Sequence, residues 1–138
     1  MSHKLYNETW KSWSNKGKNP HSIKPPFEEF DAVNSSCGDA IRIKIRIQNN
    51  QVQALGFEAT GCSICLGTIA FLSDYLPGKR MDEAIELLNA IEKTINGTLD
   101  SKNFNHLSHF KLLQEFPTRV KCVKLSTSNV KKAILSRQ

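Results

Sequence analysis

The fold of this chain is decided by the stretch Ile41-Arg42-Ile43-Lys44-Ile45-Arg46-Ile47. Isoleucine alternates there with arginine or lysine, and this period of two predicts a β-strand with one buried face and one cationic, solvated face. The polar segment 48–51 is typical of a turn, so Val52 to Ala59 is predicted to return as an antiparallel strand. The apolar phase of the returning strand shifts between Ala54 and Leu55, which indicates a β-bulge.

The residues before this hairpin predict one helix and one further strand. Apolar residues at helical spacing indicate an amphipathic helix over residues 3–15, namely Leu5, Tyr6, Trp10 and Trp13. The segment 15–20 contains Gly17 and Pro20 and ends this helix. The alternating residues Phe30, Ala32 and Asn34 favour a short strand, so the sequence predicts a meander of two or three antiparallel strands.

After Gly61 the apolar period becomes helical. Residues 62–76 are predicted to form a helix with one apolar face, made by Cys62, Cys65, Leu66, Ile69, Ala70, Ser73 and Leu76. A second helix is predicted over residues 82–96, with Gly97 as its stop. A polar link over residues 98–105 and a short helix over 107–113 lead to a last helix that begins at Pro117. Its predicted buried stripe consists of Val120, Val123, Val130 and Ile134.

This order of elements predicts an α+β fold, a small antiparallel sheet of about three strands packed against several helices. With 138 residues, the chain has the length of a single domain. We expect one domain over residues 1–138, in which 1–20 form the first helix and its exit loop, 30–59 the strands and 62–136 the helical part.

Composition narrows the functional classes. No apolar run reaches the roughly 18–20 residues of a membrane span, and the N-terminus lacks the apolar region of a signal peptide, so we expect a cytoplasmic protein without a membrane partner. The net charge is +6, but the basic residues are scattered and not interleaved with aromatic ones. We therefore do not expect nucleic acid as the partner.

The cysteines carry the chemical interest, because cytosolic cysteines are more often thiols, metal ligands or nucleophiles than disulfides. Cys37, Cys62 and Cys122 each fall at a boundary between predicted elements, and Asp39 follows Cys37 by two residues. Three thiolates and one carboxylate suit tetrahedral zinc or one face of an iron–sulfur cluster. Spacing alone leaves open whether these cysteines bind a metal or are simply buried.

Cys65 is predicted to be a small buried residue on the inner face of its helix. With Cys62 it also spells C-x-x-C, which can mark a redox pair, but that motif expects a βαβ unit and this sheet is predicted to be antiparallel. The histidines fall in polar or terminal segments and are predicted to lie at the surface, namely His3, His21, His106 and His109.

Four short motifs together resemble a known family. They are Cys37-Gly38-Asp39, the segment Gly-Phe-Glu-Ala-Thr-Gly-Cys-Ser-Ile at 56–64, Gly78-Lys79 followed by Glu83-Ala84, and the segment from Phe116-Pro117 through Cys122 to Leu125. In this order they resemble the IscU/NifU N-terminal type of iron–sulfur cluster assembly scaffold, from about Leu5 to Leu135. Two features are similar to the SufU branch: Lys121 stands where IscU-type scaffolds have histidine, and the stretch between Gly78-Lys79 and Cys122 is long.

The resemblance implies a function. Cys37, Asp39, Cys62 and Cys122 would bind Zn²⁺, and Cys37 would accept persulfide sulfur from a SufS-like, pyridoxal-phosphate-dependent cysteine desulfurase for downstream iron–sulfur assembly proteins. Arg119 matches an arginine near the family's site, and Lys121 would place positive charge beside the thiolates. The chain would then be a sulfur carrier that resembles a sulfurtransferase.

Two alternatives stay open. The same four residues could instead hold a transient [2Fe–2S] cluster, which would make the chain a non-enzymatic scaffold for cluster assembly and transfer. The second alternative is a small basic binding module whose cysteines are structural.

Overall fold

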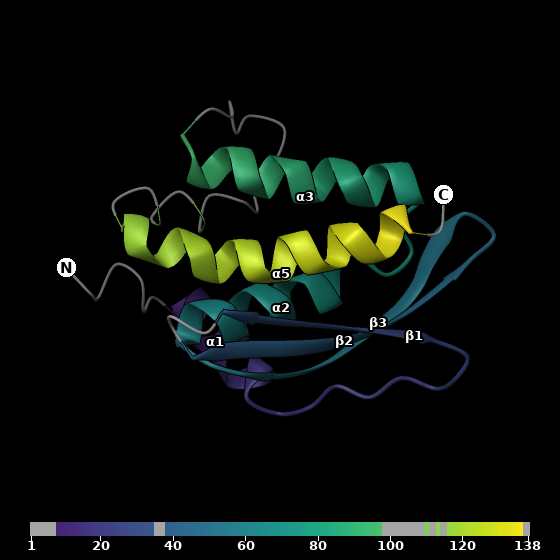
Figure 1. Ribbon diagram of the computed structural model, residues 1–138, viewed down its shortest axis with the longest axis horizontal. Helices are drawn as coiled ribbons and strands as arrows, with labels where there is room; N and C mark the ends of the chain where they lie inside the picture. The colour runs from purple at the N-terminus through teal and green to yellow at the C-terminus, as the bar shows by residue number, and fades with distance from the viewer. Residues whose placement is uncertain (1–7, 35–37, 98–109, 111–112, 114–115, 137–138) are drawn as a thin grey trace.

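The computed structural model describes residues 8–34, 38–97, 110, 113 and 116–136. Within these residues, seven elements follow one another (Figure 1): α1 (Glu8–Gly17), β1 (Glu28–Asn34), β2 (Asp39–Gln48), β3 (Gln51–Thr60), α2 (Ser63–Tyr75), α3 (Met81–Ile95) and α5 (Pro117–Leu135). The sequence-based prediction of an α+β fold with about three antiparallel strands is confirmed. None of the described helices is long and apolar enough to cross a membrane.

The sheet is a meander in the order β1-β2-β3, with both pairs antiparallel. The four isoleucines of β2 are buried while the residues between them are more exposed, as the alternation predicts. Asn49 and Asn50 connect β2 to β3 with φ values of 54° and 62°. Two consecutive left-handed residues are what a two-residue hairpin loop requires, and asparagine tolerates that conformation better than most residues.

The β-bulge lies slightly earlier than the sequence predicts. Arg46 pairs with Ala54 and Ile47 pairs with Val52, so Gln53 is the extra residue and the predicted position between Ala54 and Leu55 is wrong. Val52 and Leu55 are both buried although they lie three residues apart. Since strand side chains alternate between the two faces, one inserted residue between them is needed to turn both inward.

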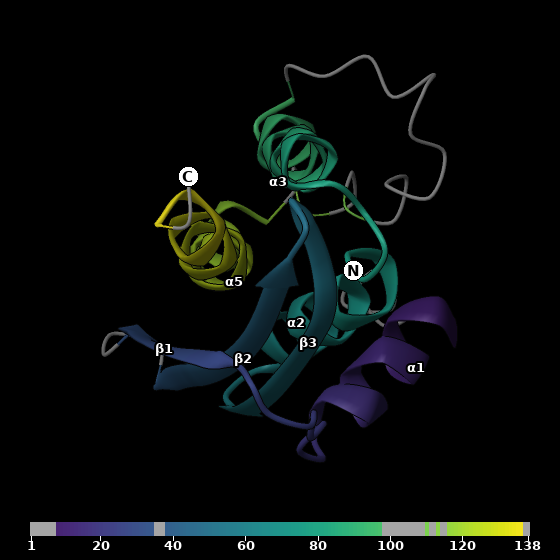
Figure 2. The same ribbon diagram turned by 90° about the vertical axis from the view of Figure 1, so that its right-hand side faces the viewer.

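The helices are stacked on the isoleucine face of the sheet. α5 contacts β1 and β2, α2 contacts β3, α1 packs on α2, and α3 packs on α5. Figure 1 shows α3 above α5 and the sheet below both, and Figure 2 shows the same helices end-on. α2 and α5 also contact each other, so the two helices cover neighbouring strands of the same face.

α2 differs from its prediction in one respect. The sequence predicts one apolar face, whereas every residue from Ile64 to Ser73 is buried. The reason is that α2 lies between the sheet and α5 on one side and α1 on the other. Gly67 allows this close approach, since the Trp10 ring occupies the space where a Cβ atom at position 67 would be.

An aromatic cluster fastens α1 to the rest of the molecule. The Trp10 and Trp13 rings lie 5.4 Å apart edge to face, and Phe110 lies 5.3 Å from Trp10. Phe110 and Leu113 are buried, but the rest of the predicted short helix over 107–113 lies outside the described residues. The same holds for residues 3–7 of the predicted first helix and for the polar link over 98–105.

Candidate metal site

Three polar side chains from three different elements meet at one end of the sheet. Asp39 is the first residue of β2, Cys62 is the N-cap residue of α2, and Cys122 lies near the start of α5. One carboxylate oxygen and the two sulfur atoms all lie within 4.8 Å of one another. The structure therefore brings together three of the four ligands that the sequence analysis predicts.

Asp39 is fully buried, and its two carboxylate oxygens have different surroundings. Oδ1 accepts a hydrogen bond from the backbone N–H of Cys62 at 3.0 Å. Oδ2 is buried as well and has no hydrogen-bond partner among the described residues. A buried carboxylate oxygen without a partner is costly, and a bound cation would compensate that cost.

Gly61 makes room for this carboxylate. Its φ of +147° lies in a region that L side chains rarely adopt, and a Cβ atom at this position would overlap Oδ1 of Asp39. Sequence reasoning assigned Gly61 no role at the site. The signal in the sequence is its place in the motif at 56–64, directly before Cys62, but the contact with Asp39 joins residues that are distant along the chain.

The interaction between Cys62 and Cys122 shifts the pKa values of the two thiols in opposite directions. The Cys122 thiol donates a hydrogen bond to Cys62, which lowers the pKa of Cys62 to about 6. The same hydrogen bond, together with burial, raises the pKa of Cys122. The Cys62 sulfur also accepts the backbone N–H of Cys65 at 3.4 Å, as an N-cap acceptor does. Cys62 is thus the thiolate of the pair in the metal-free protein, and it is also the more exposed of the two.

Cys65 faces the core, as the sequence predicts. Its side chain is completely buried, and desolvation is the main cause that raises the pKa of this thiol to about 12. Cys62 and Cys65 are both free thiols, and they follow an antiparallel strand instead of the parallel strand of a βαβ unit. The C-x-x-C spacing is therefore better explained by a ligand candidate followed by a core residue.

The remaining candidates lie elsewhere or outside the described part of the chain. Cys37, the fourth predicted ligand, falls outside the described residues, as do His3, His106 and His109. Arg119 and Lys121 lie in the first turns of α5, shortly before Cys122, Arg119 half-buried and Lys121 exposed. His21 is exposed and forms a bridge with Phe57 at the outer edge of β3.

The donor set fits a metal ion. Two thiols and one carboxylate offer the sulfur and oxygen ligands that zinc accepts, and three ligand atoms within 4.8 Å can share one ion. Thiolates are equally the usual ligands of iron–sulfur clusters. The fold and the site together define a class of protein: a small α+β domain with a thiol and carboxylate metal site at one end of its sheet.

Comparisons with known proteins identify the family. A profile of the family described as "NifU-like N terminal domain" matches residues 7–136, so the chain belongs to this family. Its relatives in this family carry the names of iron–sulfur cluster assembly proteins of the IscU and SufU kinds. The sequence-based resemblance to this family is thereby confirmed.

Two relatives and one solved structure illustrate the range of the family. An iron–sulfur cluster assembly scaffold protein IscU from Thermotoga maritima is 24% identical over 94% of this chain and 92% of its own length. The zinc-dependent sulfurtransferase SufU from Bacillus subtilis is 26% identical over 78% of this chain and 75% of its own. A crystal structure described as a scaffold for the SUF system, from Fervidobacterium islandicum AW-1, has a TM-score of 0.87 at 24% identity over 97% of this chain and 99% of its own, a likeness of fold.

Proposed function

We propose that this chain is a zinc-dependent sulfur acceptor of iron–sulfur cluster assembly, which takes persulfide sulfur on Cys37 from a pyridoxal-phosphate-dependent cysteine desulfurase. The observation that carries the proposal is the convergence of Asp39, Cys62 and Cys122, with Oδ2 of Asp39 buried and unpartnered among the described residues. The similarity to the Bacillus subtilis protein named zinc-dependent sulfurtransferase SufU supports the same activity.

The proposed ligands of Zn²⁺ are Cys37, Asp39, Cys62 and Cys122. Zinc, when bound, keeps its coordinated thiols deprotonated at neutral pH. Asp39 is the hard, weaker partner among soft thiolates, which favours a site that exchanges a ligand over a closed structural one. Cys37 precedes Asp39 by two residues, and Gly38 between them has a φ of +72°, a left-handed conformation that glycine adopts without strain.

In the proposed transfer, the Cys37 thiolate attacks the outer sulfur of the desulfurase persulfide. The sulfur–sulfur bond of the donor breaks, its cysteine leaves as a thiolate, and Cys37 then carries the persulfide. The reaction exchanges one disulfide-type bond for another, so it needs no oxidant or reductant. Arg119 and Lys121 would contribute positive charge that favours the anionic forms of the sulfur atoms.

A second candidate function uses the same residues. As a scaffold, the chain would hold a [2Fe–2S] cluster as cargo on these thiolates and pass it to downstream assembly proteins. The partial exposure of Cys62 favours this candidate, because a transferable cluster needs an accessible ligand. Under either function we propose one domain over residues 1–138 acting in the cytoplasm, where thiols stay reduced.

Metal analysis and a desulfurase assay test the proposal together. We expect about one equivalent of zinc and a colourless protein that stimulates its desulfurase. Cys37→Ala should abolish the stimulation, while Cys65→Ser, the matched cysteine outside the site, should change it little. Iron with sulfide and a brown colour would favour the scaffold, and a metal-free protein that folds and functions after chelation would contradict both.

A further inference from the structure

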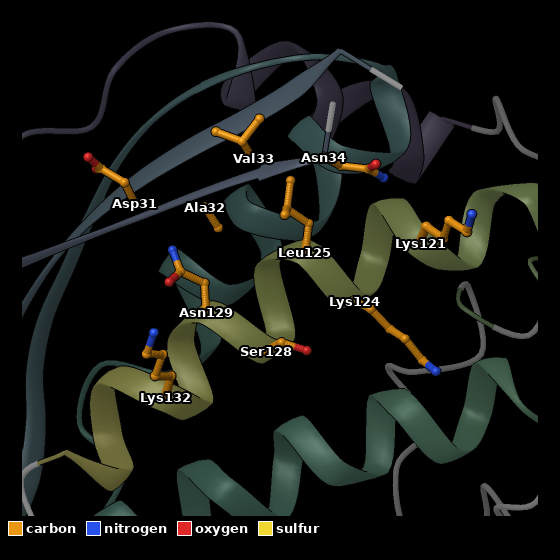
Figure 3. A pocket seen from close by; sticks show the side chains of 10 residues that line it. All are labelled: Asp31, Ala32, Val33, Asn34, Lys121, Lys124, Leu125, Ser128, Asn129 and Lys132. Carbon is orange, nitrogen blue, oxygen red and sulfur yellow. The ribbon is translucent and has the colours of Figure 1, made fainter. Parts of the chain in front are cut away.

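A groove runs between β1 and α5 beside the candidate metal site. It encloses about 460 Å³ and is lined by Asp31, Ala32, Val33 and Asn34 from the strand and by one side of α5, including Lys121, Lys124 and Lys132. Figure 3 shows the two walls, with Ala32 and Leu125 facing each other and the lysines spread along the helix. The groove differs from the site in its chemistry, since none of the described residues that line it is a proposed metal ligand.

The helical wall of the groove is strongly basic. Lys121, Lys124 and Lys132 are exposed, and within the described part of the chain none of their ammonium groups is paired with a carboxylate. Asp31, the one acidic residue among the described residues that line the groove, is already bound by Arg42 at 2.9 Å. The groove therefore presents cations whose charge is not compensated within the described structure, and it favours an anionic occupant.

The strand wall is the free edge of the sheet. Among the described residues β1 pairs only with β2, so its other side takes no part in strand pairing. On that side the carbonyl of Phe30 already accepts a hydrogen bond from the side chain of Asn129 at 3.2 Å, so the stretch available to an added strand lies beyond Phe30, toward Asn34. Four consecutive residues of β1 line the groove, although neighbouring strand side chains point to opposite faces. Only the strand edge is common to all four, so the groove follows that edge. This shape suits an extended chain.

The groove also offers apolar contacts along the same edge. Val33 is 68% exposed, which makes it the most exposed large hydrophobic residue among those described. Leu125 lies on the opposite wall and is half-buried. Val33 and Leu125 lie toward opposite faces of β1, since Val33 is on the exposed face of the strand and Leu125 belongs to α5 on the other face. An extended segment alternates its side chains, so one set of positions can lie beside Val33 while the other set faces Leu125 and the lysines of α5.

The groove ends at the candidate site. Asn34 is the register partner of Asp39, and Lys121 directly precedes Cys122. A segment lying in the groove would consequently hold whatever protein carries it close to the thiols. Affinity would come from backbone pairing and charge, and proximity to the site would follow from the position of the groove.

We propose that this groove binds an acidic, extended segment of a partner protein, which adds to the free edge of β1 with its carboxylates on Lys124, Lys132 and Lys121. The identity of the partner as a sulfur donor or cluster acceptor rests on the proposed function. The binding itself does not, because it needs neither a metal nor a reactive thiol.

The test uses a fluorescently labelled peptide of alternating glutamate and valine, with a lysine–valine peptide of equal length as the reverse-charge control. We expect saturable binding of the acidic peptide alone, weakening as salt is raised. In a two-dimensional amide spectrum of the whole protein, the shifts should centre on residues 31–34 and on the groove side of α5. No saturable binding up to about 1 mM peptide, or shifts centred elsewhere, would overturn the proposal.

Two charge-matched double variants locate the binding. The double variant Lys124→Glu with Lys132→Glu should lower the affinity for the acidic peptide about tenfold or more, because two ion pairs are lost and repulsion is gained. Lys18→Glu with Lys24→Glu changes the net charge equally at exposed positions outside the groove and should have little effect. An equal loss in both would show a non-specific charge effect and overturn the proposal.

Two further measurements test the remaining explanations, a disturbance of α5 by glutamate and a preference of the groove for nucleic acid. The neutral pair Lys124→Gln with Lys132→Gln should show an intermediate loss, which separates lost attraction from any disturbance of α5 by glutamate. A single-stranded oligonucleotide of the same charge should not displace the peptide, and displacement would assign the groove to nucleic acid instead. Desulfurase stimulation measured on the same variants is a separate readout, so the peptide result stands even if the sulfur-acceptor function fails.

Discussion

Oδ1 of Asp39 accepts a hydrogen bond from the backbone N–H of Cys62 at 3.0 Å, joining the first residue of β2 to the residue that caps α2. The bond holds a carboxylate at the N-terminus of a helix, where the helix dipole favours negative charge. It engages only one oxygen and leaves Oδ2 without a partner among the described residues. Asp39 thus has a structural role through one oxygen and a proposed metal-binding role through the other.

Substitutions at Asp39 separate these two roles. Asp39→Asn can keep the acceptor for the Cys62 N–H but removes the charge, so we expect zinc affinity to fall at least about tenfold while the free energy of unfolding of the metal-free protein changes by less than about 1 kcal/mol. Asp39→Ala removes the acceptor as well, so it should lower the free energy of unfolding by about 1–3 kcal/mol in addition to lowering zinc affinity. Competition with a chelator and urea unfolding measure the two quantities, and unchanged zinc retention in Asp39→Asn would show that the residue is not a ligand.

Gly61→Ala should disturb the site through Asp39. The φ of +147° at Gly61 alone would cost an alanine about 1–3 kcal/mol, and its Cβ would displace the carboxylate. We expect both a loss of stability and a loss of bound zinc. Gly78→Ala is the matched control, since Gly78 has a φ of +92° but open space around it. It should lose stability without losing zinc, and equal zinc contents in the two variants would contradict the role of Gly61.

The difference between local patterns and contacts that are distant along the chain explains what the sequence could predict. The alternation from Ile41 to Ile47 predicts β2 because a strand's side-chain period is a local property. The placement of Asp39 against Gly61 is not local, since it depends on the register of β2 with β3, in which Ala40 pairs with Thr60. The family motifs contain the aspartate, the cysteines and Gly61, whereas the reason for the glycine, the room that it leaves for the Asp39 carboxylate, becomes visible only in the structure.

The bulge and α2 show the same limit. A break in alternation near Ala54 predicts that a bulge exists, but the pairing with Arg46 and Ile47 decides which residue is extra. The helical period of α2 predicts the side that faces the sheet. Its other side is buried by α1, and the contact between α1 and α2 cannot be predicted from the periodicity of either helix. The local periodicity of apolar residues therefore predicts helices and strands, whereas the contacts between them are known only from the structure.

The pKa values of the cysteines predict their order of alkylation in the metal-free protein. Thiolates are the reactive form, and the hydrogen bond from Cys122 lowers the pKa of Cys62 to about 6. The rate at Cys62 should therefore rise with pH up to about 7 and then level off, whereas an ordinary cysteine, with a pKa of about 8.5, continues to gain reactivity up to about pH 9. Cys65 should stay unmodified, since it is buried and its pKa is raised to about 12.

Substitutions at position 122 provide the control for this prediction. Cys122→Ala removes the donor and should move the rise in Cys62 reactivity toward the pH of an ordinary thiol, while Cys122→Ser keeps a donor and should shift it less. Peptide mapping by mass spectrometry after timed iodoacetamide treatment measures each site. A Cys62 rate that still increases between about pH 8 and 9 in the unsubstituted protein would contradict the lowered pKa.

Gly67→Ala tests the contact that fastens α1 to α2. Helix propensity alone would make this substitution stabilising by up to about 1 kcal/mol. An added Cβ would however lie 2.5 Å from the Trp10 ring, which is only 1% exposed and surrounded by core residues. Overpacking of this kind costs about 1–3 kcal/mol, so we expect a net loss of stability and a red-shifted tryptophan emission as α1 moves away.

A double-mutant cycle with Trp10→Phe assigns this effect to the ring. The contacting atoms, Cζ3 and Cε3, belong to the larger ring of the indole, and phenylalanine lacks the atoms that extend furthest. Gly67→Ala should therefore cost less in the Trp10→Phe background than alone, with a coupling of about 0.5–3 kcal/mol from urea unfolding. Additive effects, or a stabilising Gly67→Ala, would mean that α1 adapts to the added methyl group and that the close approach at Gly67 is not what positions it.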